Sequence, residues 1–119
     1  MKKILSLLAL PLFLAACSAI PLQPGAQNIR VLNTDPKDCT FVGIVTGKQG
    51  DWLRGQVVSN ANLEEGALND LRNKALALGG NTISIITNRA GSTGIPSSKG
   101  TDYAQTNVVI TGNVWKCNY

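Results

Sequence analysis

The sequence predicts an α+β domain in which one helix packs on a three- to four-stranded, mostly antiparallel sheet. Three observations lead to this fold class: a single segment with helical apolar spacing, runs of β-branched residues on both sides of it, and a pair of distant cysteines that can join two strands. The expected order is β-β-α-β-β, with strands at 29–32, 40–46, 82–87 and 106–116 and the helix at 62–78. A length of 119 residues indicates one domain.

The clearest strand before the helix is Thr40–Thr46, which is rich in β-branched residues. Ile29–Leu32 is a shorter candidate, and a turn cluster at 33–38 separates the two.

The helix is expected to begin at Asn62, which can accept a hydrogen bond as N-cap while Glu65 occupies the capping-box position. It should end at Gly79-Gly80-Asn81, because glycine readily adopts the left-handed conformation after a helix. Gly66 lowers the helix propensity, and we expect it to allow close approach to the sheet. The apolar stripe expected to pack on the sheet is Leu68, Leu71, Ala75 and Leu78.

Between the last two strands, Asn88–Gln105 is rich in glycine, serine and threonine. So long a segment without strand character in a small domain predicts a loop that is mobile or functional.

The first 16 residues have the features of an export signal. Lys2 and Lys3 form a positive start, and the apolar run Ile4–Phe13 is about ten residues long, too short for a transmembrane helix. Leu14-Ala15-Ala16-Cys17 resembles the bacterial lipobox, which predicts cleavage before Cys17 and acylation of its thiol. Ordinary secretion, with cleavage after Ala19 and loss of Cys17, is the rival interpretation.

Acylation would give Cys17 a covalent diacylglycerol and an N-acyl chain, which together hold a protein firmly on a membrane. No other cofactor is expected. Ser18, rather than aspartate, follows the cysteine, and by resemblance to Gram-negative lipoproteins this indicates the outer membrane, with the domain in the periplasm. Residues 17–28 are expected to form the lipidated terminus and a flexible tether with a reach of roughly 18 Å, and 29–119 the globular domain.

With Cys17 assigned to lipid, Cys39 and Cys117 remain as an even pair in an oxidising compartment, and we expect a disulfide between them. A pair of free or metal-binding thiols is the alternative, and the absence of histidine makes a metal site unexpected.

The predicted disulfide aligns the first long strand antiparallel with the last strand. In that register Val42 lies opposite Val114, and Phe41 lies opposite Trp115 on the other face of the sheet. Four residues are then expected under the helix: Val42, Ile44, Ile110 and Val114. One helix cannot cover both faces, so the face with Phe41 and Trp115 should be covered by a loop or form a contact surface.

Composition argues against several functions. The formal charge is +4, two of these positive charges lie in the export signal, and the others are scattered, so no nucleic-acid partner is expected. Without histidine the chain lacks the commonest general base and metal ligand. We therefore expect no enzymatic activity and no small-molecule substrate.

The best binding candidates are Lys48, Gln49, Asp51, Trp52 and Arg54, because a tryptophan in a polar loop is a typical interface anchor. The alternative is that Trp52 folds back into the core. A polar cluster on the helix is interpreted as a solvated face or an Asp70–Lys74 pair, and it comprises Asn69, Asp70, Arg72 and Asn73.

Several motifs together resemble the small lipoproteins of the domain-of-unknown-function 4156 family: the lipobox at Cys17, Thr46-Gly47-Lys48-Gln49 with Trp52-Leu53, Asn69–Lys74, Gly79-Gly80-Asn81 and Val114-Trp115-Lys116-Cys117. More distantly, the layout resembles the outer-membrane lipoprotein that senses stress for the Rcs phosphorelay. The resemblance implies location and fold, but no chemistry.

The function expected from the sequence is that of a non-enzymatic outer-membrane lipoprotein that binds another envelope component, a protein, through the Trp52 loop or the Asn88–Gln105 loop. A peptidoglycan- or glycan-binding module and an envelope stress sensor are the two alternatives.

Overall fold

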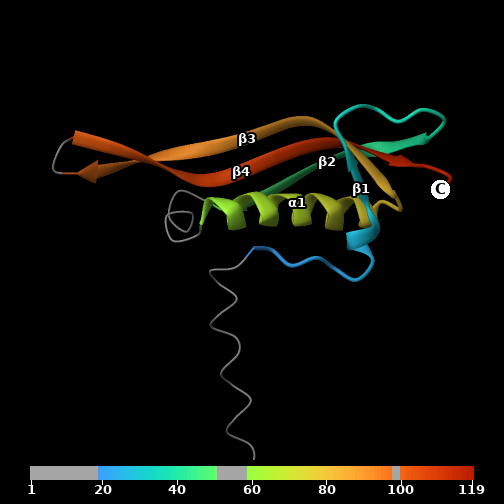
Figure 1. The fold of residues 1–119 in the computed structure, drawn as a ribbon, viewed down its shortest axis with the longest axis horizontal. Coiled ribbons are helices and arrows are strands. Elements are labelled where there is room, and N and C mark those ends of the chain that lie inside the picture. The colour runs from blue at the N-terminus through green and yellow to red at the C-terminus, as the bar shows by residue number, and fades with distance from the viewer. Residues whose placement is uncertain (1–18, 51–58, 98–99) are drawn as a thin grey trace, which may run out of the picture.

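The computed structural model describes residues 19–50, 59–97 and 100–119. It contains one α-helix and a four-stranded mixed sheet with strand order β1-β3-β4-β2 (Figure 1). β1 pairs parallel to β3, whereas β4 pairs antiparallel to both β3 and β2. The elements are η2 (Ala26–Asn28), β1 (Arg30–Leu32), β2 (Thr40–Gly50), α1 (Asn60–Ala77), β3 (Thr82–Ser97) and β4 (Gly100–Lys116). The predicted α+β class and the β-β-α-β-β order are confirmed.

The core lies between α1 and one face of the sheet. α1 packs mainly against β2 and β4 and only lightly against β3. Gly47 on β2 permits this closeness, because a Cβ at that position would overlap the backbone of Ala67 and Leu71. The fully packed residues of this core are Ile29, Leu63, Ala67, Leu71, Ala75, Ile83, Val108, Ile110 and Val114.

α1 begins and ends near the predicted positions, but its buried stripe differs. Ser59, and not Asn62, is the N-cap, and its hydroxyl accepts a hydrogen bond from the Asn62 backbone N–H at 3.2 Å. Leu68 is only partly buried, and Leu78 lies at the C-cap, 47% exposed. Leu71 and Ala75 are buried as predicted. The other two buried members of the stripe are Leu63 and Ala67, so its residues are spaced four apart.

The β2–β4 register confirms one predicted pair and corrects another. Phe41 lies opposite Trp115 as expected, but the register shifts between Phe41 and Gly43, so that Gly43 and not Val42 faces Val114. A β-bulge inserts one residue and moves the following side chains to the other face. Ile44, expected under the helix, is therefore on the helix-free face and 62% exposed.

The expected Asn88–Gln105 loop is also wrong, because its described residues, 88–97 and 100–105, belong to the long strands β3 and β4. β3 and β4 pair continuously from Thr82↔Trp115 to Ser97↔Gly100, with register shifts between Ile85 and Thr87 and between Gly91 and Ser92. Glycine and serine are weak strand formers, but backbone pairing with a neighbouring strand overrides propensity. The end of the hairpin where β3 finishes and β4 begins projects beyond the N-terminal end of α1 (Figure 1).

Candidate functional site

The N-terminal segment 19–28, here called the strap, lies along α1 on the side opposite the sheet (Figure 1). The domain thus has three layers: strap, helix and sheet. The strap ends in η2, where Ala26 is completely buried, and it leads directly into buried Ile29. Prolines and a glycine precede η2 in this segment, and residues 19–25 pack on the helix without forming a helix or strand.

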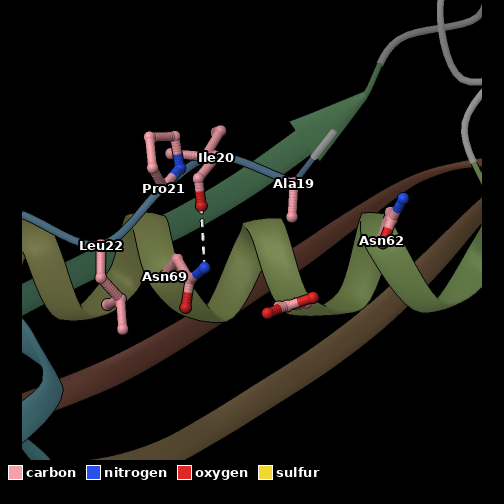
Figure 2. Close-up of a pocket in the computed structure, with 7 residues that line it drawn as sticks. Ala19, Ile20, Pro21, Leu22, Asn62 and Asn69 are labelled. Carbon is pink, nitrogen blue, oxygen red and sulfur yellow. Dashed lines mark hydrogen bonds between the residues drawn. The ribbon is translucent and has the colours of Figure 1, made fainter. Parts of the chain in front are cut away.

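Two asparagines of α1 hold the strap by its backbone. The Asn69 side-chain amide donates to the Ile20 carbonyl oxygen at 2.8 Å, as Figure 2 shows. One turn later, Asn73 donates to the Pro21 carbonyl at 3.0 Å and accepts from the Gln23 backbone N–H at 2.8 Å. Residues four apart lie on one helix face, so the two amides act as a short ladder along the strap.

The sheet also reaches the strap, through Gln49 at the end of β2. Its side-chain oxygen accepts a hydrogen bond from the Ile20 backbone N–H at 2.7 Å. Gly66 makes room for this side chain, because a Cβ at that position would overlap the Gln49 amide. The expectation that Gly66 serves a close approach is therefore confirmed, and the neighbour is a side chain of β2.

These contacts correct two predictions. Residues 17–28 were expected to form a flexible tether, yet the described part, residues 19–28, is hydrogen-bonded to α1 and β2. Asn69 and Asn73 were interpreted as a solvated face, yet Asn69 is 8% exposed and both bind the strap. Two amide side chains spaced four apart, opposite the apolar stripe and in a chain with a proline-rich segment, are the signal that points to such a role.

A cavity of about 430 Å³ lies where the strap crosses the N-terminal half of α1 (Figure 2). It opens beside Ala19, the first described residue. Its lining combines strap and helix residues: Ala19, Ile20, Pro21, Leu22, Asn62, Glu65 and Asn69.

The outer edge of β2 is capped by an ion pair on α1. The Asp70 carboxylate accepts a hydrogen bond from the Lys48 backbone N–H at 2.9 Å, and the Lys74 ammonium donates to the Thr46 carbonyl at 2.7 Å. Asp70 and Lys74 are themselves 3.0 Å apart, which confirms the predicted i,i+4 pair. The pair thus satisfies edge backbone groups that would otherwise be open to another strand.

On the other side of α1, the helix leaves part of β3 uncovered. A groove of about 410 Å³ lies between them, and its floor is formed by Val31, Leu68, Ile85 and Ile110. Its rim carries Ala61, Glu64, Glu65 and Asn88.

The helix-free face of the sheet is partly covered at the disulfide end. The Trp115 indole N–H donates to the Ser84 hydroxyl at 2.9 Å, and that hydroxyl donates to the Asp35 carboxylate at 2.6 Å. Phe41 meets Trp115 edge to face, with ring centroids 5.4 Å apart. The loop that carries Asp35 therefore covers one end of the face on which Phe41 and Trp115 were expected.

The C-terminal residue extends this cover. Thr82 donates to the Tyr119 hydroxyl at 3.0 Å, and the Arg30 guanidinium stacks 3.8 Å from the centroid of the Tyr119 ring. Beyond this cover, Ile44 is 62% exposed. The helix-free face is thus covered by the Asp35 loop and Tyr119 at the disulfide end, and it is open around Ile44.

Cys39 and Cys117 form the predicted disulfide, with an S–S distance of 2.07 Å. The bond joins the start of β2 to the end of β4.

Of the predicted binding residues, Lys48 and Gln49 lie next to each other at the end of β2, while Asp51, Trp52 and Arg54 lie outside the described residues, as does Cys17. Gln49 holds the strap, and the Lys48 side chain is exposed.

Within the described ranges there is no group of three or more histidine, cysteine, aspartate or glutamate residues placed to hold a metal ion. In the same part of the chain, no helix combines the length and apolar character needed to cross a bilayer.

Residues 20–117 match the family described as Domain of unknown function (DUF4156). The chain is 36% identical over 118 residues to "Uncharacterized protein YjeI" of Escherichia coli strain K12, an alignment covering 98% of this chain and 96% of that relative. The same values hold for relatives of that name in Escherichia coli O6:H1 strain CFT073 and in Shigella flexneri.

Proposed function

The chain belongs to the DUF4156 family, and from that premise we propose that it is a non-enzymatic lipoprotein of the bacterial outer membrane that presents its sheet to another envelope protein. In this proposal Cys17 carries the acyl chains and the domain lies in the periplasm. The groove and the helix-free face of the sheet are then the surfaces available to a partner.

One observation carries the proposal: the strap is fixed to α1 from Ile20 onward. Because Cys39 and Cys117 are joined, the Cys17 thiol is the one left for acylation. Two residues, Ser18 and Ala19, separate Cys17 from Ile20. Three Cα–Cα steps then place the acylated residue at most about 11 Å from the first fixed point. The layer order then holds the strap side of α1 toward the bilayer and the helix-free face away from it.

This geometry distinguishes a fixed anchor from a flexible one. A flexible tether would allow the domain to tumble and present any face to the membrane. A fixed strap selects one orientation, in which Leu22 on the strap, 36% exposed, is near the lipid headgroups and Ile44 on the sheet is remote from them.

The first test is mass spectrometry of the mature protein, which should find Cys17 as an acylated N-terminal residue. The second places an environment-sensitive non-natural amino acid at position 22 or 44 of the acylated protein in phosphatidylethanolamine–phosphatidylglycerol vesicles. Quenching by headgroup-labelled lipid should be stronger at 22 than at 44. An unmodified terminus downstream of Cys17 would overturn the anchor, and equal quenching at both positions would overturn the fixed orientation.

A further inference from the structure

We propose that the outer edge of β3, beyond the end of β1, receives an additional strand from an extended peptide that has apolar side chains at alternating positions and a neighbouring lysine or arginine. This inference rests on the proposed function in one respect, because it takes the peptide to be part of an envelope protein. It specifies where on the domain that partner binds and what chemistry recognises it.

The two edges of the sheet are treated differently by the fold. β1 covers β3 only along Thr82–Ser84, and among the described strands no other pairs with β3 on that side. From Ile85 to Ser92 the outer edge of β3 is therefore without a neighbouring strand in this part of the chain. A row of such backbone groups is a template for another strand.

The opposite edge, on β2, has a side-chain cap that the described residues do not provide for Ile85–Ser92 of β3, whose own irregularity is the register shift between Ile85 and Thr87. Asp70 and Lys74 bond the Lys48 N–H and the Thr46 carbonyl of that edge, so an incoming strand would first have to displace an ion pair. Natural sheets protect edges in this way against unwanted pairing. The contrast identifies the β3 edge as the one open to a partner.

The groove beside the β3 edge provides the second recognition element. An added strand points alternate side chains to the helix side of the sheet, where Leu68, Ile85 and Ile110 form an apolar floor. Leu68 and Ile85 are only partly buried in the domain itself, so apolar groups of the peptide would complete their burial. This combination of backbone pairing and side-chain pockets is how known strand-addition sites obtain affinity and specificity.

The charge at the groove rim defines the peptide further. Glu64 and Glu65 lie in the second turn of α1, are exposed, and line the groove together with its apolar residues. A lysine or arginine beside the apolar positions of the peptide would meet these carboxylates, whereas an acidic residue would be repelled. The occupant is therefore an apolar strand with basic flanks.

The test uses a fluorescein-labelled peptide of alternating valine and threonine with a lysine at each end, added to the acylated mature protein in detergent micelles. Binding is measured by fluorescence anisotropy and located by hydrogen exchange. The lysine peptide should bind and should slow amide exchange in residues 85–92 of β3, but not in residues 44–48 of β2. An analogue N-methylated at alternating amides should not bind, because it cannot form the edge hydrogen bonds.

Charge reversal provides the matched control. Glu64→Lys combined with Glu65→Lys should weaken binding of the lysine peptide by roughly fivefold, and a peptide with glutamate at each end should bind this variant better than the parent protein. Both substitutions are on the exposed side of α1, so folding should be preserved, which circular dichroism checks.

Several results would overturn the proposal: no binding, equal binding of the N-methylated analogue, protection on β2 instead of β3, or a homodimer formed through the β3 edge that excludes the peptide. Failure of the anchor is a separate result, since a mature protein without lipid would refute membrane attachment and leave the peptide measurements unchanged.

Discussion

Replacing Gly66 by alanine should destabilise this protein, although the same substitution in an ordinary helix is stabilising. In a helix interior, alanine is favoured over glycine by about 1 kcal/mol. Here the added methyl overlaps the Gln49 side-chain amide, which must move and release the Ile20 backbone N–H. A partly buried donor left without its partner costs about 1–3 kcal/mol. The net change is then a loss of about 1 kcal/mol.

The assay is urea unfolding of the disulfide-intact protein, followed by far-ultraviolet circular dichroism and read together with hydrogen exchange at the Ile20 amide. Gly66→Ala should lower the free energy of unfolding and accelerate that exchange. In the Gln49→Ala background the overlap with the amide is absent, and the remaining tight neighbour is the Ile20 backbone nitrogen at 3.0 Å. The same alanine should then stabilise by up to about 1 kcal/mol. The double-mutant cycle should therefore give a coupling of about 2 kcal/mol.

The reasoning is refuted if Gly66→Ala stabilises the parent protein as it would an isolated helix, or if the two substitutions are additive. Either result would mean that the glycine has no relation to the strap. Slow amide exchange at Ile20 in the Gly66→Ala variant would also show that the added methyl does not break the hydrogen bond between Gln49 and the strap.

Three other perturbations test separate parts of the structure. Replacing Cys39 and Cys117 by serine opens a crosslink with a sequence separation of 78 and should lower the free energy of unfolding by up to about 4.5 kcal/mol in urea titrations; an unchanged midpoint would contradict the expected role of the bridge. Asp70→Ala removes the acceptor of the Lys48 N–H, so it should destabilise by about 1 kcal/mol and produce self-association in sedimentation velocity, whereas a stable monomer would argue against edge capping. Trp115→Phe removes the indole donor to its serine partner and should lower the thermal unfolding midpoint by several degrees, roughly 1 kcal/mol; no shift would show that this hydrogen bond adds no net stability.

The elements that carry a strong local pattern could be predicted from the sequence. Thr40–Thr46 is rich in β-branched residues and lies in β2. The predicted helix 62–78 differs from α1 by two residues at its start and one at its end, although its N-cap is Ser59 and not Asn62. The disulfide was predicted from the number of cysteines and from the expected oxidising compartment. The strand and the helix depend on interactions between residues close in the sequence, and the disulfide depends on the number of cysteines. All of this information is present in a single sequence.

Features that depend on partners far apart in the chain could not be predicted. The bulge at Val42 changes which side chains of β2 face the helix. The alternation of apolar and polar residues in 40–46 does not indicate its position. Residues 88–97 and 100–105 are rich in glycine, serine and threonine, and pairing between β3 and β4 is what makes them extended. Local propensity is a weak guide where tertiary hydrogen bonds decide.

The candidate site shows the same division. Lys48 and Gln49 were singled out as a possible contact with another molecule, but the Gln49 amide and the Lys48 backbone bind within the chain, to the strap and to Asp70. The strap was not predicted, because its proline-rich residues are held by Asn69 and Asn73 from another element, and the spacing of these two amides was interpreted as a solvated face. The open edge of β3 likewise emerges only from the order of the strands.

The arrangement of β2 beside β4 has a consequence for biosynthesis. A polypeptide grows from its N-terminus, so β2 exists for the whole time in which α1, β3 and β4 are still being made, without the one strand that pairs with it. α1 follows soon after, and Asp70 and Lys74 can cover one flank of β2 while the other stays bare. Closure of the ring between Cys39 and Cys117 therefore has to wait for synthesis of β4, and a chain that stops within β4 would leave β2 without its pairing strand and prone to association.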